Sequence, residues 1–149
     1  MVPVRLPGTL HINLHLERMG NQCVNIAKLT KLTLNLMIAS ELLESFQKMG
    51  EQAEAMTEEA MTAFTERNAE RGERLVTMDS VINSENRNLA RQIMALGADE
   101  QTREAGLHAI IISRCLERIG DNAVDIGERV AYLVSGEFRE FTDASHPGE

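Results

Sequence analysis

The chain has 149 residues, 43% of them apolar, and a formal net charge of −8 at pH 7. A chain of this length buries roughly two-thirds of its unfolded surface, so its core needs no metal or disulfide, and its apolar share excludes a disordered chain. Only 3% of the residues are aromatic, which excludes an all-β fold because strands favour aromatic and β-branched residues. The acidic balance excludes nucleic acid as the main partner, since binding a duplex needs a basic face.

The cysteines and the apolar clusters indicate the compartment. Cys23 and Cys115 are too few and too far apart for a disulfide framework or a paired-cysteine metal site, and we interpret them as buried free thiols in a reducing compartment. The first residues lack the apolar stretch of a secretory signal, and the densest apolar cluster, 109–112, is far shorter than a membrane span. We therefore expect a cytoplasmic protein without direct membrane insertion.

The first run of apolar residues at three- and four-residue spacing predicts one long helix over 10–48. Glycines stand at both of its ends, Gly8 before it and Gly50 after it. His15 falls on the apolar stripe of this helix, so we interpret it as a core histidine and not as a ligand.

Three further runs predict helices over 52–66, 69–96 and 100–135. Asn68 is the expected N-cap of the middle one, and Asp99 is the expected N-cap of the last one. Four helices with short connections favour an all-α fold in the form of an elongated antiparallel bundle.

An internal repeat is the most informative feature of the sequence. The segment 16–27 reads LERMGNQCVNIA, and the segment 116–127 reads LERIGDNAVDIG. Half of the aligned positions are identical and the others exchange similar residues, which favours duplication of a helical unit. Each copy places a glycine, Gly20 or Gly120, in the middle of a helix, where it is unfavourable. We expect close approach of a neighbouring helix to be the reason.

Acidic residues form a row in the second copy. Glu117, Asp121 and Asp125 are spaced four apart, so they share one helix face, which points away from the core stripe. Asp79 and Asn83 have the same spacing on the preceding helix. Two such helices packed antiparallel would bring together oxygen ligands that suit a divalent cation or iron. The alternative is a solvated polar face that binds no metal.

The first copy offers a weaker metal site made of Glu17, Asn21 and Asn25, because amide oxygens carry no charge. The sequence does not distinguish among Fe, Zn, Mg, Ca and Ni as the possible ion. It contains no Glu-x-x-His pair, which counts against a carboxylate-bridged oxidase. It also has no glycine-rich phosphate loop and no nucleophile elbow, so we expect no enzymatic activity and no catalytic residues.

The residues of the second copy resemble a known family. The segment 116–126, followed by 131–137, resembles the signature helix of the PhoU family of phosphate-transport regulatory proteins. The segment 16–28 resembles the matching helix of the first repeat of that family, and Asp79 and Asn83 are similar to the acidic pair on its neighbouring helix.

The resemblance implies a domain organisation. PhoU proteins are two tandem three-helix bundles with metal-binding Glu/Asp-x-x-x-Asp motifs. By this resemblance, 10–48 is the third helix of a first repeat that lacks its first two helices, and 51–136 is a complete second repeat. The expected fold is therefore an elongated antiparallel three-helix bundle with one extra long N-terminal helix. The segment 137–149 loses the helical period and is predicted to be frayed.

The resemblance also implies a function, which is negative regulation of phosphate uptake and phosphate-regulon signalling. Such a regulator couples the ATPase of the phosphate ABC transporter to the sensor histidine kinase. The helix 10–48 keeps an apolar stripe that the missing helices would have covered, so we expect a homodimer. The alternative is a helical homodimerisation or scaffold module that binds no metal.

Overall fold

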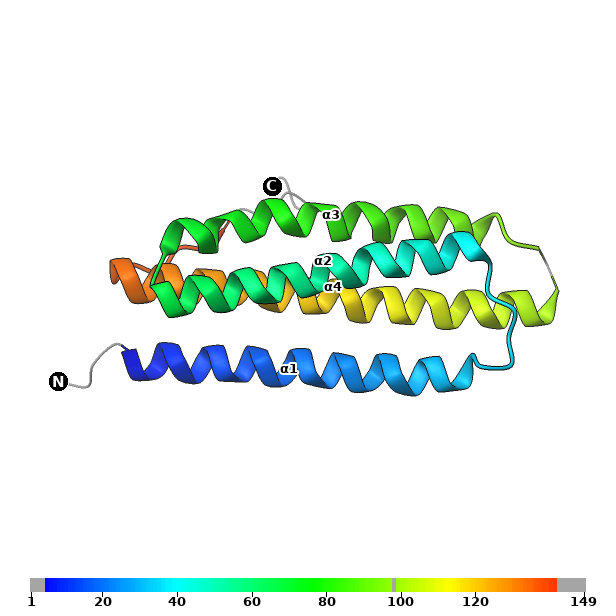
Figure 1. The fold of residues 1–149 in the computed structure, drawn as a ribbon, viewed down its shortest axis with the longest axis horizontal. Coiled ribbons are helices and arrows are strands. Elements are labelled where there is room, and N and C mark those ends of the chain that lie inside the picture. Colours follow the sequence, from blue (N-terminus) through cyan, green and yellow to red (C-terminus); the bar gives the residue numbers. More distant parts are fainter. Residues whose placement is uncertain (1–4, 98, 142–149) are drawn as a thin grey trace.

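A computed structural model describes residues 5–97 and 99–141 of the chain. These residues form four helices: α1 (Arg5–Leu32), α2 (Ser40–Glu66), α3 (Ala69–Met94) and α4 (Glu100–Ser135). Consecutive helices run in opposite directions along one long axis (Figure 1). The helices α2, α3 and α4 pack against one another, and α1 lies along α4. The predicted all-α fold, an elongated antiparallel three-helix bundle with an extra N-terminal helix, is confirmed.

The ends of the last two helices are set by local side-chain chemistry. The Asn68 side chain accepts a hydrogen bond from the backbone N–H of Arg71 at the start of α3. Asp99 accepts one from the N–H of Thr102 at the start of α4, at 2.9 Å. Gly136 closes α4 with a φ of 76°, which glycine adopts without strain. Both predicted N-caps are confirmed.

The predicted continuous helix over 10–48 is wrong. The helix α1 already begins at Arg5 and ends at Leu32, and the chain reverses direction before α2 starts at Ser40. The Thr33 hydroxyl donates to the carbonyl of Thr30 at 2.9 Å, and the Thr33 backbone N–H donates to the same carbonyl at 3.1 Å, so Thr33 closes the last turn of α1. Gly50 lies inside α2 and does not end a helix, so the helix predicted over 52–66 begins twelve residues earlier than expected.

The reversal after α1 allows the first turns of α2 to join the bundle. Leu42 packs with Leu89 of α3 and Ala109 of α4 in a small second core near the α3–α4 turn. A helix running straight from 10 to 48 would carry Leu42 away from both partners. Its burial, with 1% of its surface exposed, contributes roughly 1.5–3 kcal/mol to the stability of the fold.

The main core runs along the centre of the three-helix bundle. Its fully buried members come from all three helices, and they include Met56, Leu75, Ile82 and Ile126. The backbones of α3 and α4 lie in close contact at Gly72 and Gly127. A Cβ atom built on Gly127 would lie 2.7 Å from the carbonyl oxygen of Gly72. Only glycine permits this approach, because any side chain there would force the two backbones apart.

The apolar stripe of α1 packs mainly against α4. Ile12 and Met19 are buried, with 2% and 5% of their surfaces exposed, and they join the main core. The expectation that this stripe lies uncovered is therefore wrong. Within the described helices, α1 makes close backbone contacts with α4 alone. The side of α1 toward α2 is open enough to leave hollows between the two helices.

The segment that follows α4 folds back on it. The ring of Phe138 meets the Tyr132 ring edge-on at 6.2 Å between centroids, and the guanidinium of Arg129 lies 4.7 Å from the centre of the Phe138 ring. Residues 137–141 have no helical structure, as the loss of the helical period predicts, but they keep these contacts with α4; 142–149 lie outside the described residues. No helix within the described ranges combines the length and apolar character that a membrane span requires.

The two cysteines lie in different environments, and this difference predicts their reactivity. Both are free thiols, but Cys23 is exposed and only Cys115 is buried, so the expected burial of Cys23 is wrong. Burial raises the pKa of the Cys115 thiol and so disfavours the reactive thiolate. We expect a disulfide reagent to modify Cys23 quickly in the native protein and Cys115 only after unfolding. In Cys23→Ser the fast phase should vanish, and two equally fast phases in the native protein would contradict the burial.

Candidate functional site

The acidic residues singled out in the sequence surround one hollow between α3 and α4. This acidic pocket has a volume of about 480 Å³. It is lined from α3 by Asp79 and Asn83 and from α4 by Glu117, Asp121 and Asp125. The helices α3 and α4 run antiparallel (Figure 1), and their packing brings residues of both rows to the same pocket. All five residues predicted for the stronger metal site therefore lie around one pocket.

Asp79 is the buried carboxylate of the acidic pocket, with 5% of its surface exposed. One of its oxygens accepts a hydrogen bond from the Asn83 amide at 2.8 Å. The other oxygen, Oδ1, lies against Gly120 of α4, in space that a side chain at that position would fill. A Cβ atom built on Gly120 would be 2.7 Å from Asp79 Oδ1. The expected close approach at Gly120 is present, and it gives the Asp79 carboxylate the space that it occupies.

Arginines that the sequence analysis did not single out also line the acidic pocket. Arg114 pairs with Glu117 one turn away, and Arg118 lies beside them. The spacing i, i+3 between Arg114 and Glu117 was visible in the sequence as a signal for this pair. Within residues 5–97 and 99–141, no three His, Cys, Asp or Glu side chains lie close enough together to hold a metal ion.

A buried polar contact joins α1 to the acidic row. His15 has 7% of its surface exposed, as the prediction of a core histidine requires. Its Nδ1 lies 2.9 Å from Asn122 Oδ1 and 3.4 Å from a carboxylate oxygen of Asp125. The Asn122 amide nitrogen donates to the carbonyl of Arg118, so its oxygen faces the imidazole and His15 Nδ1 donates. This contact fixes the position of α1 against the helix that carries the acids.

Glu128 extends the acidic row by a fourth residue. It lines the acidic pocket together with Phe141, and its carboxylate accepts a hydrogen bond from the Phe141 backbone N–H at 2.8 Å. Burial raises the pKa of Glu128, and the nearby Asp125 raises it further. The spacing of three residues after Asp125 could have revealed Glu128 in the sequence. The position of Phe141 had no such signal, because it depends on how the chain folds back.

The raised pKa of Glu128 predicts a pH-dependent effect on stability. Because the pKa of Glu128 is higher in the folded than in the unfolded state, the folded state favours the protonated acid. The resulting stabilisation is complete at a pH below the pKa of the unfolded state. It is lost as the pH rises through the pKa of the folded state. Glu128→Gln keeps the acceptor for Phe141 and removes the charge. We expect it to stabilise the protein at pH 7 by roughly half a kcal/mol, after discounting for solvent, and to lose this advantage near pH 3.5.

Thermal unfolding followed by circular dichroism at both pH values measures this effect. Glu54→Gln, at an exposed position of α2, is the matched control, with no change of comparable size at either pH. A Glu128→Gln variant that is less stable than the wild type at pH 7 would contradict the assignment.

The residues of the first copy are not brought together in the same way. Glu17, Asn21 and Asn25 are all exposed on α1, and none of them lines the acidic pocket. The expected helix contact at Gly20 is also absent from the described part of the chain, since a Cβ atom there would meet nothing within 4 Å. The two copies therefore differ in environment although their sequences are similar.

Comparison with known proteins identifies the family. The family model for the PhoU domain matches residues 46–130, which lie in α2, α3 and α4. The chain is 25% identical over 136 residues to a phosphate-specific transport system accessory protein PhoU homolog of Clostridium acetobutylicum, a match that covers 91% of this chain and 62% of the relative. It is 30% identical over 133 residues to the PhoU homolog 1 of Thermotoga maritima, covering 85% of this chain and 55% of the relative.

A solved structure gives the same result. The fold is similar to the crystal structure of the phosphate transport system regulatory protein PhoU from Streptococcus pneumoniae, with a TM-score of 0.79 and 27% sequence identity. The match covers 90% of this chain and 63% of the other. The chain thus spans between half and two-thirds of the length of these relatives. Since the family model covers more than half of the sequence, the chain belongs to the PhoU family.

Proposed function

We propose that this protein is a cytoplasmic, non-catalytic negative regulator that couples the ATPase of a phosphate ABC transporter to a phosphate-sensing histidine kinase. The observation that supports this most strongly is the family match over α2 to α4, together with relatives named as accessory proteins of phosphate transport. The acidic pocket, whose lining includes Glu117 and Asp121, lies within the matched region. It offers an anionic surface to a basic partner.

A co-purification experiment tests the association. The transporter ATPase and this chain are co-expressed, and one is captured by a tag on the other at two salt concentrations. We expect a complex that weakens with salt and with the double variant Glu117→Gln, Asp121→Asn. The control is Glu51→Gln, Glu54→Gln, which removes two exposed acids of α2. Failure to capture the ATPase at low salt would count against the proposed coupling, and the same assay with the kinase tests the second partner.

Regulation is tested in cells that lack their own PhoU protein. Expression of the chain is expected to repress a reporter driven by a phosphate-regulated promoter when phosphate is ample. Repression by the wild type and not by the Glu117→Gln, Asp121→Asn variant supports the proposal. Unchanged reporter activity on expression of the wild type would refute negative regulation by this chain.

A divalent metal ion is a further part of the proposal. The carboxylates around the acidic pocket are the hard oxygen donors that such ions prefer. Holding an ion there requires side-chain rotation, for example release of Glu117 from Arg114. Isothermal titration with Fe²⁺, Zn²⁺, Mg²⁺, Ca²⁺ and Ni²⁺ is expected to show one saturable site that Asp121→Asn weakens. Glu17, Asn21 and Asn25 are candidates for a weaker second site, which Glu17→Gln would remove.

A helical interaction module without metal is the second candidate. This candidate is favoured because side chains of the acidic pocket already pair with one another. Arg114 forms an ion pair with Glu117, and the Asn83 amide donates a hydrogen bond to Asp79. The same titration separates the two candidates. Absence of saturable binding, with partner capture retained, favours the module.

Association of two copies completes the proposal. Leu10, Leu14 and Val24 of α1 remain 61%, 41% and 51% exposed, and covering them in a homodimer would remove apolar surface from water. Size-exclusion chromatography with light scattering is expected to give twice the chain mass, and Leu10→Glu with Val24→Glu is expected to give the monomer. A monomeric wild type at all concentrations would exclude this dimer.

A further inference from the structure

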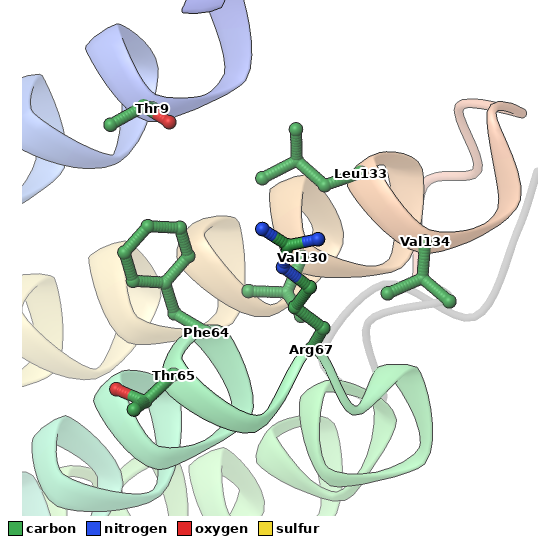
Figure 2. Close-up of a pocket in the computed structure, with 7 residues that line it drawn as sticks. All are labelled: Thr9, Phe64, Thr65, Arg67, Val130, Leu133 and Val134. Carbon is green, nitrogen blue, oxygen red and sulfur yellow. The ribbon is translucent and has the colours of Figure 1, made fainter. Parts of the chain in front are cut away.

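A second pocket lies at the opposite side of α4, where the start of α1 meets the ends of α2 and α4. This end pocket has a volume of about 310 Å³. Its apolar walls come from Phe64 of α2 and from Val130, Leu133 and Val134 of α4 (Figure 2). None of its lining residues belongs to the acidic pocket. The end pocket is therefore a separate site from the acidic pocket.

One arginine supplies the charge of the end pocket. Figure 2 shows the Arg67 side chain extending from the end of α2 toward Val130 and Leu133. The hydroxyl-bearing residues Thr9 and Thr65 complete the lining. Among the described lining residues, the site thus combines apolar walls with one cation and polar groups at its edge, which is the usual composition of a small-ligand pocket near the lower end of the size range.

The Arg67 guanidinium has no acidic partner within the described residues. Two acids of α2 pair with another arginine, since Arg71 lies 2.8 Å from Glu59 and 2.9 Å from Glu66. Arg67 is an exposed residue that lines the end pocket, so its guanidinium is open to a ligand that enters from solvent. An anion placed there would gain a charge-assisted hydrogen bond, and the guanidinium can offer it two parallel donors.

The backbone at Arg67 is a further reason to look for a ligand. It has a φ of 52° and a ψ of 47°, the left-handed conformation that closes α2. Glycine, and less often asparagine, is the usual residue at such a helix end, because a Cβ atom is unfavourable there. The backbone conformation by itself favours glycine at this position. The presence of arginine there therefore indicates a role for its side chain, such as holding a ligand.

We propose that the end pocket binds a small amphipathic anion, with a short alkyl chain against Val130 and Leu133 and a carboxylate or phosphate group on Arg67. The aliphatic walls select the alkyl body, and the Arg67 guanidinium selects an anionic group. Inorganic phosphate has no apolar body and gains nothing from these walls. The proposal is independent of phosphate regulation, because it uses none of the residues on which that proposal depends.

Protein-observed NMR titration tests the proposal with octanoate and octyl phosphate as probes, each below its micelle concentration. We expect saturable shifts centred on residues 64–67 and 130–134 for both probes. Octanol, which lacks the charge, and inorganic phosphate, which lacks the chain, should each bind at least about tenfold more weakly. A preference for one of the two octyl probes identifies the anionic group as a carboxylate or a phosphate.

Arg67→Gly is the decisive variant, because glycine suits the left-handed backbone and the protein should stay folded, with a Tm about 2–4 °C higher. It should weaken octanoate binding about tenfold or more, whereas Arg67→Lys keeps part of the affinity. Arg103→Ala, at an exposed arginine of α4 outside the end pocket, should bind like the wild type. Equal binding by Arg67→Gly, shifts centred elsewhere, or no binding of either octyl probe would each overturn the proposal.

Discussion

Replacing Gly127 with alanine is expected to destabilise the protein by about 2 kcal/mol or more. The new methyl group would lie 2.7 Å from the Gly72 carbonyl oxygen and 2.8 Å from a methyl carbon of Leu75. A backbone oxygen cannot rotate away as a side chain can, so α3 and α4 must separate and lose packing along the core. Urea unfolding measures the change, and the Tm should fall by roughly 5 °C.

Gly20→Ala is the matched control, because Gly20 is also a glycine inside a helix but meets nothing within 4 Å where its Cβ atom would stand. Alanine should stabilise the protein there by about 1 kcal/mol, since it forms helices better than glycine. The two identical substitutions are thus expected to act with opposite signs. A Gly127→Ala variant as stable as the wild type, or more stable, would show that the close contact of α3 with α4 at Gly127 is wrong.

Replacing Leu75 with alanine is the second large effect, with an expected loss of about 3 kcal/mol. Leu75 is completely buried in the main core, where α3 faces α2 and α4. Shortening it removes apolar contacts and leaves a cavity that the surrounding helices cannot fully close. Chemical denaturation with a global two-state fit measures the loss.

Leu107→Ala serves as the comparison, because Leu107 also lies in a helix but is 64% exposed. Its replacement should change the free energy of unfolding by no more than about 0.5 kcal/mol. A Leu75→Ala variant that unfolds at the same urea concentration as Leu107→Ala would show that Leu75 does not belong to the core.

Local sequence signals determined much of this structure. Asn68 and Asp99 cap their helices as expected because an N-cap depends on one side chain and the N–H groups two or three residues later. The pairing of Asp79 with Asn83, and of Glu117 with Asp121, on one face of each helix also followed from spacing, since residues four apart share a helix face whatever the helix packs against.

Tertiary packing determined the structural features that local sequence patterns did not predict. The reversal at Thr33 contains neither glycine nor proline, and it is favoured because Leu42 gains the second core. Gly20 and Gly120 occupy the same place in the repeat, yet only Gly120 faces a neighbouring helix in the described structure. The sequence by itself determined the helix type, the capped ends and the acidic rows, each of which depends on residues within a few positions of one another. Only the tertiary structure decided where α1 lies, which glycines are required and how Phe141 reaches Glu128, because those contacts join residues far apart in the chain.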